Sequence, residues 1–314
     1  EIGVRLVGSE MCIRDRLNKG PVLFAEGYLF AMERRGYLSA GAFVPEVVLE
    51  HPEVVSQLHR EFIRAGSDVV QAFTYYGHRE KLRLIGKEEL LEPLQKNALQ
   101  IAKDARDEFK DLDLLVCGDV ANTNIYDPKD KKSNIECQKM FEEQVAWAKE
   151  AGVDFIVAET ITWVEEMKIA LKAIKDADLI AVCNYAFRRD GKTRDGYSAE
   201  DSCKIMEDLG ADVVITQLFY DNQFYYDFVE RCRNMGITKP IVPGLLPILN
   251  LDQTKRITGI CGSDIPKELL NELSAAGNDR QRVQQIGISH TVEQAIDLLE
   301  QGVPVIHFYV LNQY

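Results

Sequence analysis

A regular alternation of short apolar runs with longer amphipathic segments is the feature that most constrains how this chain can fold. Eight such runs follow one another, and most precede a segment whose apolar residues recur at helical spacing. Apolar runs separated by helices are typical of a parallel sheet whose faces are both covered. We therefore predict an α/β fold, a (β/α)8 barrel of the TIM type. The runs cover residues 21–26, 68–75, 114–119, 155–159, 179–184, 213–218, 240–244 and 304–310.

The amphipathic segments between these runs predict the helices. The sequence stops at Tyr314, soon after the eighth run, so the final helix of the barrel is expected to be missing. In a barrel of this type the ligand chemistry lies at the carboxyl ends of the strands. The expected helices cover 45–65, 88–109, 135–151, 163–174, 199–209 and 225–235, with two more near 254–260 and 267–276 inside the long connection from 245 to 290.

Charge and composition exclude several classes of partner. A formal net charge of −13 and a pI near 5.0 argue against nucleic acid, because phosphate binding needs clustered lysine and arginine. No apolar run approaches the roughly 18 residues that cross a membrane, so no membrane partner is expected. The seven cysteines are dispersed and form no CxxC pair, which favours a reducing compartment. We expect a cytoplasmic protein.

The first residues stand apart from the rest of the chain. Residues 1–16, EIGVRLVGSEMCIRDR, have no hydrophobic period and no signal-peptide pattern. The run VGSEMCIRDR looks like the translation of a sequencing adapter. We interpret 1–16 as a non-native or disordered leader and leave it out of the fold prediction.

Acidic and polar residues gather where the predicted strands end. Glu26 and Glu159 each end an apolar run, and in a barrel their carboxylates would face one cavity. There they could bind an amine or act as acid and base, although strand-end acids can also cap helices or bind loop amides. An idle carboxylate would be costly to desolvate, which favours the functional interpretation. The other strand-end residues are Tyr75, Tyr76, His78, Asp119, Asn122, Asn124, Asn184, Gln217, His307 and Tyr309.

Two histidines and an aromatic cluster near these ends each have two interpretations. His78 precedes a charged helix start and is as well explained by a solvated loop, whereas His307 lies inside an apolar run and is favoured as an interior histidine. The aromatic cluster at 219–228 could wall a flat heteroaromatic ligand or pack a helix against the barrel. The sequence has no Rossmann, P-loop, serine-hydrolase or zinc-protease motif.

Residues 17–209 resemble the homocysteine S-methyltransferases of the betaine-homocysteine type. The resemblance rests on the segments LNKG, ERRGYLSAGAFVPEVVLEHPEVV, LHREFIRAGSDVVQAFTYY, GVDFIVAE and DGKTRDGYS. It implies that Glu26 and Glu159 hold the amino acid part of homocysteine. It also implies that Tyr76 and Phe43 wall the methyl-donor pocket. Betaine-using members have aspartate and tryptophan at the places of Glu26 and Phe43. The resemblance therefore does not determine which methyl donor this protein would use.

The same resemblance implies a zinc ion that activates the homocysteine sulfur as a thiolate. In that family one cysteine at the end of the sixth strand and a Cys-Cys pair at the end of the eighth hold the zinc. This chain has ITQL at 215–218 and HFYV at 307–310. All three thiolates are missing, so we expect no metal and no other cofactor in the chain as it stands. Methyl transfer is then expected to be weak or absent.

Residues 210–314 resemble the second half of the barrel of methylenetetrahydrofolate reductase. The matching segments are ITQLFYD, MGITKPIVPGLLPI, CGSDIP and HFYVLNQ, and Gln217 stands at the glutamine that contacts the folate pterin in that family. The resemblance implies a flavin-dependent reductase as an alternative function, with FAD as its cofactor. The flavin and general-acid motifs of that family's first half are not in this chain.

The two resemblances meet in register at the sixth predicted strand. We predict a hybrid of two half-barrels, with units 1–5 over 17–209 and units 6–8 over 210–314. Two origins are compatible with this hybrid: recombination of two half-barrels into one enzyme, or a chimera in which neighbouring reading frames were merged. The predicted function is that of a homocysteine S-methyltransferase-like protein of one-carbon and methionine metabolism, whose small-molecule partner is homocysteine or a folate. The alternatives are the folate reductase and a non-catalytic binding protein.

Overall fold

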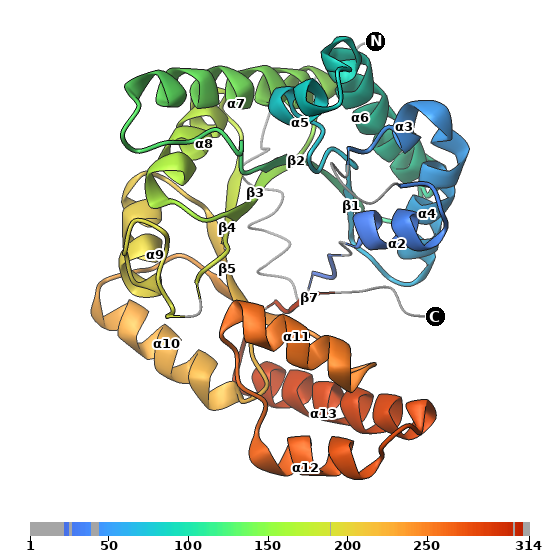
Figure 1. Ribbon diagram of the computed structural model, residues 1–314, viewed down its shortest axis with the longest axis vertical. Coiled ribbons are helices and arrows are strands. Elements are labelled where there is room, and N and C mark those ends of the chain that lie inside the picture. The colour runs from blue at the N-terminus through green and yellow to red at the C-terminus, as the bar shows by residue number, and fades with distance from the viewer. Residues whose placement is uncertain (1–21, 25–26, 39–43, 189, 304, 310–314) are drawn as a thin grey trace.

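A computed structural model of the chain describes residues 22–24, 27–38, 44–188, 190–303 and 305–309. Seven strands form one parallel sheet, and each strand pairs with the next one along the chain. The sheet curls around a central axis (Figure 1), and because its strands are parallel their carboxyl ends lie on the same side of it. The strands are β1 (Val69–Gln71), β2 (Leu115–Ala121), β3 (Phe155–Ile161), β4 (Ala181–Tyr185), β5 (Val213–Leu218), β6 (Ile241–Leu245) and β7 (His307–Phe308).

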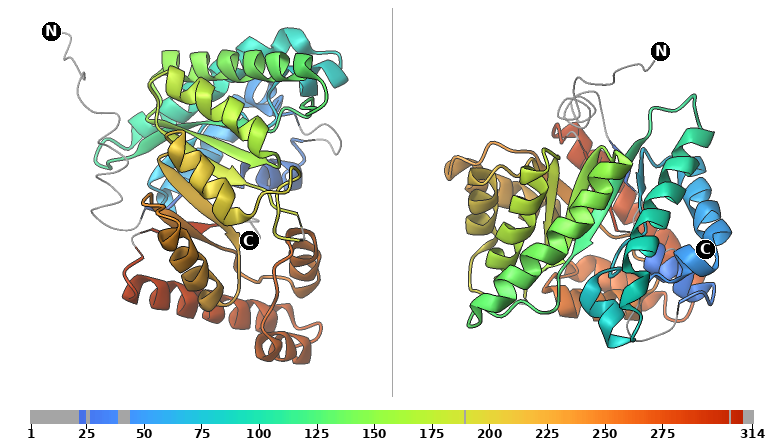
Figure 2. Two further views of the ribbon diagram at one scale, coloured as in Figure 1. Left: turned by 90° about the vertical axis from the view of Figure 1, so that its left-hand side faces the viewer. Right: turned by 90° about the horizontal axis from the view of Figure 1, so that it is seen from above.

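Helices surround the outside of the curled sheet (Figures 1 and 2). Within the described part of the chain, none of them is long and apolar enough to cross a membrane. The helices are α2 (Tyr28–Arg34), α3 (Val47–Glu50), α4 (Pro52–Arg64), α5 (Arg79–Leu84), the 3-10 turn η1 (Glu88–Leu90), α6 (Leu91–Glu108), α7 (Lys131–Ala151), α8 (Val164–Asp176), α9 (Ala199–Asp208), α10 (Asn222–Asn234), α11 (Leu251–Cys261), α12 (Lys267–Ala275) and α13 (Arg280–Glu300).

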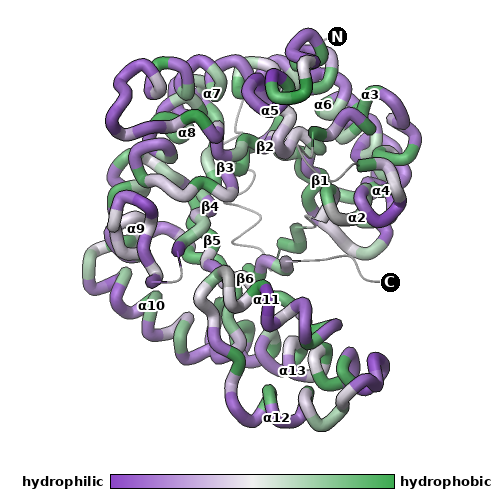
Figure 3. Tube along the Cα trace, viewed as in Figure 1, coloured by the Kyte–Doolittle hydropathy of each residue, from purple (hydrophilic) through white to green (hydrophobic). Residues whose placement is uncertain are grey.

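Apolar side chains fill the inside of the curled sheet. One buried cluster takes residues from all eight predicted strand positions, including the runs at 21–26 and 304–310. In Figure 3 the strands combine the hydrophobic colour with hydrophilic stretches, and the helices alternate between both colours. Because this interior is packed with hydrocarbon, polar side chains are left to the strand ends. The cluster consists of Val22, Val69, Leu115, Cys117, Phe155, Val157, Ile180, Val182, Val213, Ile215, Val242 and Val305.

The outer face of the sheet packs against the helices through a separate cluster. In β3, Phe155 and Val157 belong to the inner cluster, whereas Ile156 and Ala158 belong to the outer one. This alternation follows from the two-residue period of a strand. Both faces are buried, which explains why the strands read as continuous apolar runs in the sequence.

The two ends of the sheet lie close to one another. The first predicted run is present as a single parallel bridge between Phe24 and Val69. The ring of Phe24 lies 6.0 Å from that of His307, the first residue of β7. Residues 25–26 and 304 lie outside the described residues. The prediction of an α/β fold with parallel strands is confirmed, with seven strands in the curled sheet.

The predicted helix over 45–65 is interrupted at His51, so the prediction of one continuous helix is wrong. Helix α3 ends at Glu50 and α4 begins at Pro52. Proline disfavours the helical conformation of the residue before it, and His51 accordingly has φ −140° and ψ 60°. The other expected helices agree with the structure to within a few residues at each end.

Helix α13 was not predicted, although it is 21 residues long. Its apolar residues lie on two sides, because Ile286 and Leu298 are buried while Ile288, Val292 and Ile296 are half exposed. A helix that is apolar on two sides has only a weak amphipathic period, so the sequence pattern did not indicate α13 within the connection from 245 to 290.

Gly287 is the point at which α13 packs against the loop between β6 and α11. A methyl group at this position would lie 1.9 Å from the backbone oxygen of Ile248, in the loop between β6 and α11. Gly287→Ala is therefore expected to lower the free energy of unfolding by about 1–3 kcal/mol through overpacking, as measured by urea denaturation. Gln285→Ala, at an exposed position of the same helix, is the matched control. Equal stability of the two variants would contradict this packing.

Candidate functional site

A cavity of about 340 Å³ opens at the carboxyl ends of the strands. Its wall combines residues from the front of the chain with others from β5 and from just beyond β7. The lining residues are Gly27, Tyr28, Leu29, Gln71, Phe73, Tyr75, Glu159, Thr160, Asn184, Tyr185, Ala186, Gln217 and Tyr309. The cavity lies where a barrel of parallel strands is expected to hold its ligand.

Glu159 is the carboxylate of this cavity. It lies near the end of β3, and its Oε1 accepts a hydrogen bond from Nε2 of Gln71 at the end of β1, at 3.2 Å. Gln71 is only 4% exposed, whereas Glu159 is partly exposed to the cavity. Burial, followed by the negative charge of Glu159, raises the pKa of the neighbouring Tyr75. Tyr75 therefore stays a neutral phenol beside the carboxylate.

An irregularity in β3 turns two consecutive residues toward the cavity. The register with β4 shifts between Ala158 and Ile161, and both Glu159 and Thr160 line the cavity. Thr160 has a φ of 57°, which is a strained left-handed conformation for a β-branched residue. Its hydroxyl group accepts a hydrogen bond from the hydroxyl of Tyr75 at 3.4 Å. Bulges of this kind are common beside functional sites because they redirect side chains.

The far wall of the cavity comes from the second half of the chain. Gln217 lines it at the end of β5, and its side-chain oxygen accepts a hydrogen bond from the backbone of Leu218 at 3.0 Å. Tyr309 donates a hydrogen bond from its hydroxyl to the backbone oxygen of Thr216 at 2.8 Å. The Tyr309 ring lies directly over Gly244, where an added methyl group would be 2.5 Å from the ring. A glycine is therefore needed for the ring to close this side.

The structure brings together two of the five residues predicted for the site. Glu159 and Gln217 line one cavity although they come from the two halves of the chain. Tyr76 does not line it, because its ring lies 4.2 Å from that of Tyr75 and under the ammonium group of Lys81, on the α5 side. Glu26 and Phe43 lie outside the described residues.

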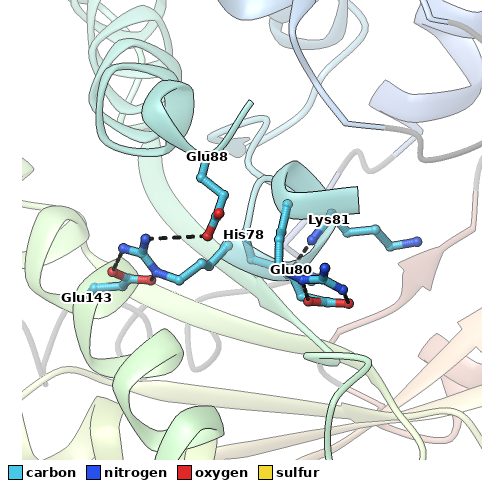
Figure 4. Close-up of polar contacts among 7 residues, drawn as sticks. His78, Glu80, Lys81, Glu88 and Glu143 are labelled. Atoms are coloured by element: carbon cyan, nitrogen blue, oxygen red, sulfur yellow. Dashed lines mark hydrogen bonds and ion pairs between the residues drawn. The ribbon is translucent and has the colours of Figure 1, made fainter. Parts of the chain in front are cut away.

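His78 is buried, so the interpretation as a solvated loop histidine is wrong. Its side chain is 1% exposed and caps α5 by accepting a hydrogen bond from the backbone of Lys81. Burial, with a smaller effect of the Lys81 charge, lowers the pKa of His78 to about 4. The expected helix start does carry charges, and Arg79 reaches Glu143 of α7 at 2.7 Å and Glu88 at 3.9 Å (Figure 4).

Sequence reasoning missed Gln71 and Tyr28 as cavity residues. Gln71 was visible as a polar residue near the middle of the second apolar run. Tyr28 gave no such signal, because its position depends on a distant partner. Its hydroxyl lies 2.9 Å from Nδ1 of the fully buried His59 in α4, and its ring stacks on Phe73 at 5.7 Å.

The donors around the cavity do not fit a thiolate-bound zinc ion. Among the described residues, no group of three histidine, cysteine or acidic side chains is arranged to hold a metal. The strand ends instead present the carboxylate of Glu159, the amides of Asn184 and Gln217, and the phenol of Tyr309. Zinc sites of the expected kind need sulfur or nitrogen ligands.

Comparisons with known families give two matches along the chain. The homocysteine S-methyltransferase family model matches residues 27–219, and the methylenetetrahydrofolate reductase family model matches residues 202–314. The two matches overlap from α9 to the end of β5. Both resemblances identified in the sequence are confirmed. Because the first match covers more than half of the chain, the protein belongs to the homocysteine S-methyltransferase family.

Individual relatives support this assignment. The chain is 36% identical over 214 residues to betaine--homocysteine S-methyltransferase 1 of Bos taurus, covering 67% of this chain and 51% of the relative. It is 42% identical over 168 residues to the same enzyme of Mus musculus, covering 52% of this chain and 40% of the relative. The chain thus spans about half the length of the curated relatives it matches. The homocysteine methyltransferase MmuM from Escherichia coli, in its metallated form, has a similar fold, with a TM-score of 0.64, 16% identity and 94% coverage of both chains.

Burial of His59 beneath the cavity predicts a specific pH dependence of stability. Burial, with a smaller effect of Arg60, lowers the pKa of His59 to about 3. Below the ordinary pKa of histidine, about 6.5, His59 binds a proton in the unfolded chain but stays neutral in the folded chain. The contribution of His59 to the free energy of unfolding is therefore complete above about pH 6.5. It is lost as the pH falls toward about 3, at up to about 1.4 kcal/mol per pH unit.

Urea denaturation of the wild type and of His59→Gln between about pH 7 and pH 4 tests this expectation. Both proteins lose stability in acid because His78 contributes in the same direction, but the loss should be smaller for the variant. His51→Gln, at a half-exposed position just before α4, is the matched control and should follow the wild type. Parallel profiles for the wild type and His59→Gln would contradict the prediction.

Proposed function

We propose that this protein binds homocysteine in the cavity at the strand ends and has little or no methyltransferase activity. The observation that carries the proposal is the partly buried hydrogen bond between Gln71 and the carboxylate of Glu159 in a chain of the homocysteine S-methyltransferase family. A carboxylate held by an amide in a mostly apolar cavity suits the ammonium group of an amino acid. The names of the curated relatives support homocysteine as that amino acid.

The remaining polar groups of the cavity would hold the rest of the ligand. The side chains of Asn184 and Gln217 lie on neighbouring strands and can bind a carboxylate or a second polar group. Phe73 and Tyr75 supply an apolar wall for the methylene groups. We also propose that the curled sheet closes as a (β/α)8 hybrid barrel, supported by the inner cluster drawn from all eight strand positions. A cytoplasmic location fits these assignments.

Weak methyl transfer follows from the residues at the zinc positions of the family. Gln217 ends β5 and Tyr309 follows β7, where the family resemblance calls for cysteines. An alkyl thiol such as that of cysteine has a pKa of about 8.5 in water, and the described residues that line the cavity include no cationic side chain to stabilise a thiolate. The protein would then hold homocysteine with a largely protonated sulfur, which is a poor nucleophile.

Homocysteine is expected to raise the melting temperature of the wild-type protein, because a ligand that binds only the folded state stabilises it. Glu159→Gln should weaken binding at least tenfold, or about 1.4 kcal/mol, by removing the charge that faces the ammonium group. Calorimetric titration measures both affinities. Glu142→Gln, at an exposed position of α7, is the matched control. An unchanged affinity in Glu159→Gln would contradict the proposed binding mode.

Methyl transfer is tested separately from binding. We expect no methionine above the background without protein when the wild type is incubated with homocysteine, betaine and added zinc. The mouse relative, assayed under the same conditions, is the positive control. Turnover by this chain would overturn the proposed inactivity while leaving the binding proposal in place.

A flavin-dependent folate reductase is the second candidate. The family match over residues 202–314 and the position of Gln217 in the cavity favour it. The purified protein would then carry a bound flavin with an absorbance band in the visible range. A colourless protein that neither gains a band with added FAD nor binds a folate would remove this alternative.

A further inference from the structure

Helix α13 has an exposed row of apolar side chains, the α13 stripe, on the side that faces away from the core. Its members are spaced by four, four and three residues, which places them on one side of a helix. Because a helix has 3.6 residues per turn, this side lies opposite Val283, Gly287 and Gln294, which are buried. The stripe consists of Ile288, Val292, Ile296 and Leu299, whose exposed fractions are 50%, 50%, 50% and 43%.

The α13 stripe differs from the other exposed apolar residues of the described chain. Those residues are scattered, and no two of them belong to the same helix. Single exposed apolar side chains are ordinary, whereas a continuous row of them in contact with water marks an interaction surface. The helix lies along the lower edge of the molecule in the left view of Figure 2, where a second molecule can approach it. The scattered residues are Leu23, Tyr37, Leu84, Leu112, Ile135, Leu209, Phe224 and Met235.

Charged residues beside the stripe favour a second copy of α13 as its partner. Arg282 and Glu300 are exposed near the two ends of the helix, and the 18 residues from 282 to 300 make five turns, so both lie on the same flank. When two identical helices pack antiparallel, the same flanks meet and the start of one helix lies beside the end of the other. Arg282 of each copy then approaches Glu300 of the other copy. Opposite charges at both ends favour this orientation over a parallel one.

The apolar residues fit the same arrangement. With Val292 at a two-fold axis, Ile288 of one copy lies opposite Ile296 of the other, because each is four residues from Val292. Arg282 and Glu300 are 10 and 8 residues from Val292, a mismatch of about 3 Å along the helix that a long arginine side chain can span. Two-fold contacts between identical surfaces are the commonest in protein oligomers.

Arg282 is available for such a contact. It lies 3.7 Å from Glu272 in α12, and both side chains are more than half exposed, so this ion pair does not bury the guanidinium group. An anionic membrane is a less suitable partner for the stripe. Helices that lie on membranes carry lysine and arginine beside their apolar side, whereas Glu293 and Glu300 accompany Arg282 here and the chain has a net charge of −13.

We propose that the α13 stripe is the interface of a homodimer in which two copies of the helix pack antiparallel about Val292. Four half-exposed side chains from each copy make a small interface compared with the roughly 1,200–2,000 Å² of a stable complex. The dissociation constant is therefore expected to be on the order of 10–100 µM. The described residues that line the strand-end cavity do not include any from α13, so the proposal does not depend on homocysteine binding.

Sedimentation equilibrium of the full chain, from about 1 to 500 µM, measures the association. The average mass is expected to rise with concentration from the 35.6 kDa of one chain toward twice that value. Val292→Glu places two carboxylates together at the axis and should weaken the dimer at least about tenfold. Ile135→Glu, at an exposed position of α7, is the matched control and should leave the association unchanged.

Exchange of the flanking charges tests the antiparallel orientation. Arg282→Glu places like charges at both ends of the helix pair and should weaken the dimer about fivefold. The double variant Arg282→Glu with Glu300→Arg restores opposite charges and should recover the affinity of the wild type. In a parallel pair Arg282→Glu would only replace one like-charge contact by another. Equal affinity of Arg282→Glu and the wild type would therefore overturn the antiparallel arrangement.

Other outcomes overturn the dimer itself. A wild-type chain that stays at 35.6 kDa throughout, or a Val292→Glu variant that associates as strongly as the wild type, would mean that the stripe does not join two copies. Binding of that monomer to anionic vesicles would identify a lipid surface as the partner instead. Association that passes the dimer mass without a plateau would show non-specific aggregation. Melting curves establish that each variant is folded, and Val292→Glu should melt within a few degrees of the wild type because Val292 is half exposed.

Discussion

A parallel strand that is buried on both faces has no room for polar side chains except at its ends, and this constraint organises the whole molecule. The inner face is filled by one cluster drawn from all eight strand positions, and the outer face is covered by helices. Polar groups that a ligand could use are therefore confined to the carboxyl ends. There they define the cavity of Glu159, Gln71 and Gln217.

The same constraint explains why halves that match two families can share one sheet. Val213 and Ile215 of β5 continue the inner cluster, and the packing there requires only apolar side chains of suitable volume. The ends of the strands are less tolerant, because metal binding requires particular donors at particular places. Gln217 is compatible with the packing of β5, where the two family matches overlap. It does not supply the thiolate that the zinc site of the homocysteine S-methyltransferase family requires from this strand. The packing of the strands therefore places fewer demands on residue identity than metal binding at their ends does.

The ends of strands β4 and β5 contribute to two adjoining cavities of different character. Asn184 lines the polar cavity at the strand ends and Phe219 lines the aromatic cavity under α9 and α10, whereas Tyr185 and Gln217 line both. One join in the chain consequently affects both cavities.

The sequence by itself determined the strand order, most of the helices, the parallel sheet and the strand-end positions of Glu159 and Gln217, because these depend on local periodicity and on where apolar runs stop. It also contained the break at Pro52, which was overlooked. Only the tertiary structure decided that His78 is buried, that Thr160 turns into the cavity through a bulge, and that the α13 stripe is exposed. Burial and hydrogen bonding depend on neighbours that are distant in the chain, and no local pattern encodes them.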